Sequence, residues 1–181
     1  VNGVLNSANV AVASGASVGG SGTLAGNVQL ADGATLLGGG AAAPLSVGAL
    51  SLSSGTNLDF SLGSAASSTT VVNVAGNLTL DGTLNISNAG GFGTGVYQLF
   101  SYGGSLTDNG LVYGSLPVPV DNLTLQTAIA NQINLLVQNA PGEVQFWNGG
   151  TTNPDRTIAG GAGQGGPDTN WTDATGACAL G

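Results

Sequence analysis

The 181 residues are enough for one domain, and 41% of them are hydrophobic, so a sizeable core can be buried. Nine acidic residues outnumber one base, Arg156, and the net charge of −8 excludes the cationic surface that nucleic acids require. The same charge opposes binding to an anionic membrane, and no apolar run is long enough for insertion into a bilayer. Because the chain has no His and a single Cys, Cys178, a Ser-His-Asp triad and an internal disulfide are excluded.

Internal repeats begin close to the amino terminus. The segment Asn9–Val12 recurs 18 residues later as Asn27–Leu30, and further copies follow at Leu50–Leu52 and Leu78–Leu80. Spacings of 18 to 28 residues suit a coil of two or three short strands and their turns. Stacked coils would place equivalent residues about 4.8 Å apart along an axis. Two inward columns are therefore predicted: Val10, Val28, Leu50 and Leu78, and Val12, Leu30, Leu52 and Leu80.

Apolar and polar residues alternate within the copies, which is typical of strands with one buried face. Leu58, Phe60 and Leu62 share one face, and the polar residues between them lie on the other. The same alternation occurs over residues 123–126 and 133–137. Ser-Gly, Asp-Gly and Gly-Gly pairs between the strands mark turns.

Two architectures satisfy this pattern: a parallel β-solenoid, and an antiparallel sandwich or barrel. A sandwich does not require equivalent residues at regular offsets, so the repeats favour the solenoid. We expect an all-β chain in which residues 1–138 form a parallel β-helix. Within it, residues 1–90 form regular coils, and residues 91–138 form less regular coils or a cap. Residues 139–181, rich in Gly, Asn and Thr, are expected to be a connector or the start of the next repeat unit.

Candidate chemical sites are few. Asp59 and Asp81 lie on outward faces of adjacent copies, where paired carboxylates would suit acid–base catalysis, but separate solvated acids are the simpler interpretation. The segment Gly160–Asp168 lacks an Asp that a calcium repeat requires and does not recur, so we interpret it as a loop. No Lys and no helix start follow Gly20–Gly22 or Gly38–Gly40, which we interpret as turns rather than phosphate-binding loops.

The remaining aromatic and reactive side chains do not change this interpretation. Trp147 and Trp171 would stack on sugars or pack against the next coil, and packing is the expectation because aromatic rings bury a large area. Cys178 has no basic neighbour in the sequence that would activate its thiol. We therefore expect no catalytic residue, no metal and no cofactor. Outward rows of Thr, Asn, Ser and Gln are the candidate binding surface.

A further set of motifs follows one order along nearly the whole chain. They cover Gly22–Val28, Ser46–Leu52, Val74–Leu84 and Gly95–Leu106, then Val144–Gly150 and Thr169–Ala174 in the tail. In this order they resemble the passenger-associated repeats of bacterial autotransporter passenger domains. Cys178 departs from that family, whose members tend to avoid cysteine, but it lies beyond the regular repeats.

The resemblance implies a right-handed parallel β-helix at the bacterial cell surface, exported by a C-terminal β-barrel translocator elsewhere in a longer chain. In this family the repeat segment usually serves as a stalk. We expect this chain to be the non-enzymatic stalk and display segment of an adhesin, with a host-surface glycan or matrix protein as partner. The alternatives are a self-association module for cell–cell aggregation, the stalk of a surface enzyme, and an antiparallel β-sandwich binding module.

Overall fold

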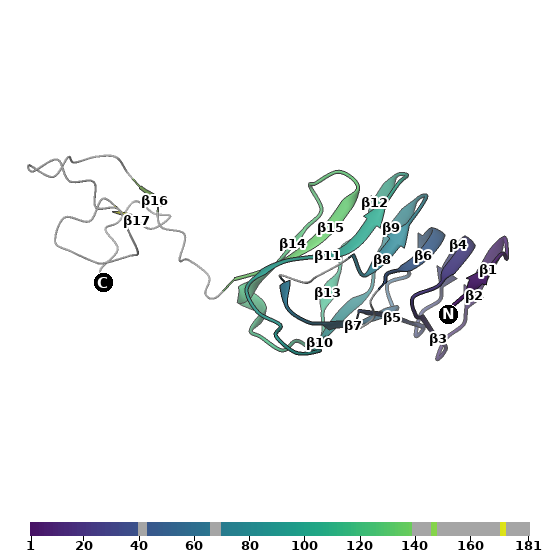
Figure 1. Cartoon of the computed structure of the whole chain (residues 1–181), viewed down its shortest axis with the longest axis horizontal. Coiled ribbons are helices and arrows are strands. Elements are labelled where there is room, and N and C mark those ends of the chain that lie inside the picture. The colour runs from purple at the N-terminus through teal and green to yellow at the C-terminus, as the bar shows by residue number, and fades with distance from the viewer. Residues whose placement is uncertain (40–42, 66–69, 139–145, 148–170, 173–181) are drawn as a thin grey trace, which may run out of the picture. The chain divides into compact units, whose positions relative to one another are not determined.

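A computed structural model describes residues 1–39, 43–65, 70–138, 146–147 and 171–172 of the chain (Figure 1). The chain divides into two units, residues 1–138 and 139–181. The strands of the first unit are β1 (Val4–Leu5), β2 (Asn9–Val12), β3 (Ser17–Gly19), β4 (Thr23–Leu30), β5 (Thr35–Gly39), β6 (Leu45–Ser51), β7 (Asn57–Leu62), β8 (Val72–Val74), β9 (Leu78–Leu80), β10 (Thr83–Asn88), β11 (Gly95–Tyr102), β12 (Leu106–Asp108), β13 (Val112–Tyr113), β14 (Leu123–Gln126) and β15 (Gln132–Val137). A 3-10 helix, η2 (Val120–Asn122), precedes β14.

The strands from β1 to β13 wind as a parallel β-helix with three faces (Figure 1). Face 1 contains β1, the first halves of β4 and β6, β8, and the second half of β11. Face 2 contains β2, the second halves of β4 and β6, β9 and β12. Face 3 is a separate five-stranded sheet in the order β3, β5, β7, β10 and β13. All these pairings are parallel, so the sandwich alternative is wrong and the β-helix prediction is confirmed.

The strand register confirms the first predicted column and the Val12–Leu30 pair of the second. Asn9–Val12 pairs residue for residue with Asn27–Leu30. Val28 then pairs with Leu50, and Leu50 pairs with Leu78. These three side chains are 1%, 2% and 0% exposed, so all of them point into the core. Val10, which heads the column, is only partly buried because β2 has a described neighbour on one side alone.

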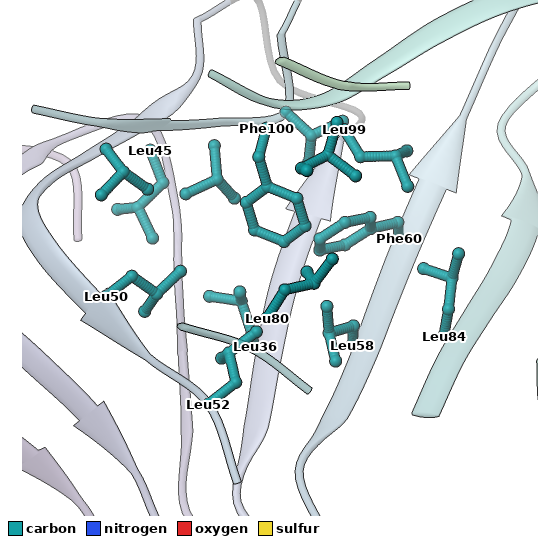
Figure 2. Packing of buried hydrophobic residues seen from close by; sticks show 14 of the residues in the cluster. Leu36, Leu45, Leu50, Leu52, Leu58, Phe60, Leu80, Leu84, Leu99 and Phe100 are labelled. Carbon is teal, nitrogen blue, oxygen red and sulfur yellow. The ribbon is translucent and has the colours of Figure 1, made fainter. Parts of the chain in front are cut away.

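The interior of the helix is filled by aliphatic side chains and a few rings. Figure 2 shows Leu36, Leu58 and Leu80 gathered in the same interior although they come from different coils. The rings of Phe60 and Phe100 are tilted by 56° with centroids 5.7 Å apart. Full burial of one such side chain contributes about 1.5–3 kcal/mol, so the core is the main source of stability.

A column of glycines forms the corner between face 1 and face 2. The amide of Gly76 donates to the carbonyl of Gly48 at 2.6 Å, and the amide of Gly104 donates to that of Gly76 at 2.9 Å. A Cβ added at Gly48 would lie 2.7 Å from the carbonyl oxygen of Gly26 and closer still to that of Ala25. Successive coils therefore keep their strand spacing at this corner only because no side chain is present.

The sheet direction changes beyond β11. β15 pairs antiparallel with β11, and β14 pairs antiparallel with β15. The alternation predicted for residues 133–137 is interrupted, because Asn134 is buried together with Ile133 and Leu135. A register shift between Gln98 and Phe100 lies directly opposite, where β11 has one extra residue, Leu99, which is buried beside Phe100.

In the second unit the structure describes the backbone of two short strands. These are β16 (Phe146–Trp147) and β17 (Trp171–Thr172), which pair antiparallel with Trp147 opposite Trp171. The role of residues 139–181 as a connector or a further repeat unit stays a prediction, and so does the division of residues 1–138 into regular coils and a cap.

Candidate interaction surface

Face 2 presents a regular array of small polar side chains to solvent. The pairs Ala11–Gln29, Gln29–Ser51, Ser51–Thr79 and Thr79–Thr107 place one residue per coil in a single outward column. Gln29, Ser51 and Thr107 are exposed and Thr79 is half-buried. Within the described residues the side chains of this face 2 column make no hydrogen bond of their own. They form the outward Thr, Ser and Gln row expected from the sequence.

Neighbouring columns differ because their polar side chains bond from coil to coil. The Asn27 amide donates to the Asn9 side-chain oxygen at 3.3 Å along face 2. The side-chain oxygen of Asn77 accepts the backbone amide of Ser105 at 3.0 Å. On face 1 the Ser101 hydroxyl donates to the Asn73 side chain at 2.8 Å. These side chains stabilise the spacing between coils, so part of their hydrogen-bonding capacity is already used when a partner approaches.

The turns between face 2 and face 3 form an acidic edge. The carboxylate of Asp32 accepts the backbone amide of Gly55, in the next coil, at 2.9 Å. The Ser53 hydroxyl and then this amide lower the pKa of Asp32 below its ordinary value, because both donate to the ionised form. Farther along, Asp81 accepts the amide of Gly82 at 2.8 Å and the side chain of Asn109 at 3.3 Å. The acids therefore support turns.

The two acids considered as a catalytic pair have separate partners. Asp59 lies on face 3, where its carboxylate accepts the Asn85 side-chain amide at 2.8 Å. The Asn85 oxygen in turn accepts the backbone amide of Ser115 at 2.8 Å. Asp81 lies in the turn that precedes face 3, bonded to Gly82 and Asn109 as described above. Each carboxylate thus belongs to a coil-to-coil ladder, and nothing in the arrangement couples one to the other.

The other candidate sites can be placed only in part. Gly20 has a φ value of 120°, which suits the turn expected there, whereas Gly38 and Gly39 belong to strand β5 and Gly40 lies outside the described residues. The described residues contain no group of three or more His, Cys, Asp or Glu that could hold a metal ion. In the same part of the chain no helix has the length and apolarity to span a bilayer. Cys178, Glu143 and Gly160–Asp168 lie outside the described residues, as do the side chains of Trp147 and Trp171.

One polar anchor was not anticipated from the sequence. Tyr97 is 1% exposed, yet its hydroxyl accepts the amide of Gly93 at 3.0 Å and contacts the carbonyls of Gly93 and Gly63 at 3.0 and 3.1 Å. Its ring stacks on Phe92 with centroids 5.0 Å apart. A Tyr in an apolar strand is one signal in the sequence, since a buried phenol needs a partner. One of its partners, Gly63, lies in the preceding coil, and the alternation of residues does not reveal it.

The comparisons with known proteins agree with this geometry. Over 130 residues the chain is 43% identical to the adhesin BmaC autotransporter of Brucella suis biovar 1 (strain 1330). The match covers 68% of this chain and 4% of that protein, so the chain corresponds to a small part of its length. No family model matches the chain, and no solved structure matches it significantly. Together, the parallel β-helix and this similarity identify the chain as a segment of the autotransporter passenger-domain type.

Proposed function

We propose that this chain is the structural stalk and display segment of a surface-exposed adhesin and is not itself an enzyme. The observation that carries the proposal is the continuous column Val28, Leu50 and Leu78, paired in register and almost fully buried. Because every coil packs against the next and forms hydrogen bonds with it, the stack is a stiff rod. Such a rod holds a binding region away from the cell.

The polar chemistry supports a structural role. Three of the described acids, Asp32, Asp59 and Asp81, bond to amides of the same or the next coil. Acid–base catalysis needs a proton-transfer group poised beside a substrate, and these carboxylates instead stabilise turns and ladders. The similarity to an autotransporter adhesin supports placement at the cell surface or in the secreted fraction.

A host-surface glycan or a matrix protein is the proposed partner of the whole adhesin. If this segment takes part in that contact, the face 2 column is the surface we propose. Gln29, Ser51 and Thr79 keep unused hydrogen-bonding groups there, and strand pairing repeats them at regular intervals. A repeating polar surface suits a repeating polymer, because each coil then offers the same donors and acceptors.

Binding and sedimentation measurements on the purified chain test the stalk proposal. We expect an elongated monomer whose sedimentation coefficient does not change with concentration, and no saturable binding to immobilised glycans or matrix proteins. The variant Gln29→Ala/Ser51→Ala/Thr79→Ala should then behave as the wild type. A face 1 variant, Thr23→Ala/Ser46→Ala, removes two neighbouring small polar side chains of another face and controls for general surface changes.

Two results would count against a passive stalk. Saturable binding that the face 2 variant abolishes and the face 1 variant retains would make face 2 the contact surface. Association that rises with concentration would instead favour the self-association module.

A further inference from the structure

Within the described residues, the outermost strands at the two ends of the coil stack are paired differently. At the amino-terminal end β1 and β2 pair only with β4, and β3 pairs only with β5. Their outer edges carry no further described strand. Val1, Val4 and Leu5 at this end are 42%, 69% and 47% exposed.

At the other end the outer edge of β11 is occupied. One side of β11 pairs in parallel with β8, as at Phe100–Val72. The other side pairs antiparallel with β15 through Tyr97–Leu135 and Phe100–Ile133. A strand has two hydrogen-bonding edges, and both edges of β11 are used. A further parallel coil consequently has no place to pair on this strand.

The hairpin also covers the core beneath it. Ile133 and Leu135 of β15 are fully buried, and Leu123 of β14 is 7% exposed. Leu111, Leu116, Val118 and Leu125 add a partly buried layer packed on the same core. On face 3 the Tyr113 hydroxyl accepts the backbone amide of Leu125, and burial raises the pKa of Tyr113. The last strand of face 3 is thus tied to the first strand of the hairpin.

We infer that the β14–β15 hairpin is a cap, which covers the outer edge of β11 on face 1 by reversing strand direction and prevents another parallel coil from adding to that strand. The inference does not depend on the stalk function. An uncapped β11 would expose unpaired amides and carbonyls above Leu99 and Phe100, both 0% exposed, and such an edge pairs readily with another chain.

The test compares two charge-matched substitutions in the same hairpin of the 181-residue chain. Leu135→Asp places a charge in the buried face of β15, whereas Thr124→Asp places it on the exposed face of β14. We expect Leu135→Asp to raise amide hydrogen exchange over residues 132–137 by about tenfold or more. It should also give oligomers that grow with concentration in sedimentation velocity, beyond the wild-type level. Thr124→Asp should match the wild type in both measurements.

A milder variant keeps the inference testable when the buried charge unfolds the chain. Leu135→Ala should accelerate exchange in β14 and β15 while β6, β7 and β9 keep wild-type protection. Equal loss of protection in all these strands would overturn the inference, because the hairpin would then be an inseparable part of one cooperative stack. A loosened hairpin without added association would also overturn it, because the edge of β11 would need no cover.

Discussion

Replacement of a single glycine at the corner of the coils gives the sharpest test of the stacking geometry. In Gly48→Ala the new Cβ would lie 2.7 Å from the Gly26 carbonyl oxygen and even closer to the Ala25 oxygen. Real Cβ atoms essentially never approach other atoms within 3.0 Å. Both obstacles are backbone atoms, so no side-chain rotation relieves the clash. Gly48 must therefore move away from the Gly26 coil, and the 2.6 Å hydrogen bond from the Gly76 amide to the Gly48 carbonyl leaves little room on the other side.

The size of the effect follows from this geometry. Overpacking a well-packed region costs about 1–3 kcal/mol, and two rigid contacts place Gly48→Ala at about 2–3 kcal/mol. With a urea m-value of about 2 kcal/mol per molar, the unfolding midpoint should fall by about 1–1.5 M. Loss of a glycine also stiffens the unfolded chain, which stabilises by about 0.4–1 kcal/mol. That contribution has the opposite sign, so a measured loss of stability reports the clash.

Urea unfolding followed by far-ultraviolet circular dichroism measures the change. Gly3→Ala is the matched control, because nothing lies within 4 Å of a Cβ added at Gly3. Its midpoint should stay close to that of the wild type. Gly76→Ala should fall between the two, since its Cβ would meet one carbonyl, that of Gly48, at 2.9 Å. Equal midpoints for Gly48→Ala and Gly3→Ala would refute the argument that the corner requires glycine.

The remaining predictions concern the core, the buried phenol and the acidic edge. Leu78→Ala should lower the free energy of unfolding by about 2–5 kcal/mol in urea titrations, whereas the outward Thr79→Ala should change it little. Tyr97→Phe should cost about 0.5–1.5 kcal/mol, seen as a lower Tm, because it removes hydrogen bonds to the half-buried backbone groups of Gly63 and Gly93. Asp32 has a lowered pKa, so its stabilising contribution is present above its unfolded value of 3.8 and is lost as pH falls through the folded value. Asp32→Asn should therefore flatten the acid limb of the Tm-against-pH profile.

The parallel stack was predictable because both of its signals are local in the sequence. Alternation assigns an inner face to each strand, and the repeat offset aligns one coil with the next. The two together gave the pairs Val10–Val28, Val28–Leu50 and Leu50–Leu78 correctly. Leu58, Phe60 and Leu62 are buried for the same reason. These assignments need no knowledge of long-range contacts beyond the repeat itself.

Other features were not predictable, because they depend on what the neighbouring coil brings near. Strand direction in β15 leaves no trace in the sequence, since parallel and antiparallel strands share the same alternation. The partners of Tyr97 include the carbonyl of Gly63, 34 residues away. In the sequence, Asp32 looks like any acidic residue in a turn. Its carboxylate accepts the amide of Gly55 because the intervening coil is 23 residues long, and the local sequence does not show this. Irregular coil lengths hide such contacts.

Many polar side chains on the surface of the β-helix form hydrogen bonds between adjacent coils, and this limits where a partner can bind. Asn27 bonds to Asn9, Ser101 to Asn73, and Asn85 to Asp59, each across one coil boundary. A ligand that competes for these groups must break a bond that spaces the rod, so binding there would weaken the stack. The face 2 column has no such commitment, and contact through it leaves every coil-to-coil bond intact. A partner that binds through the face 2 column would therefore leave the stiffness of the stack unchanged.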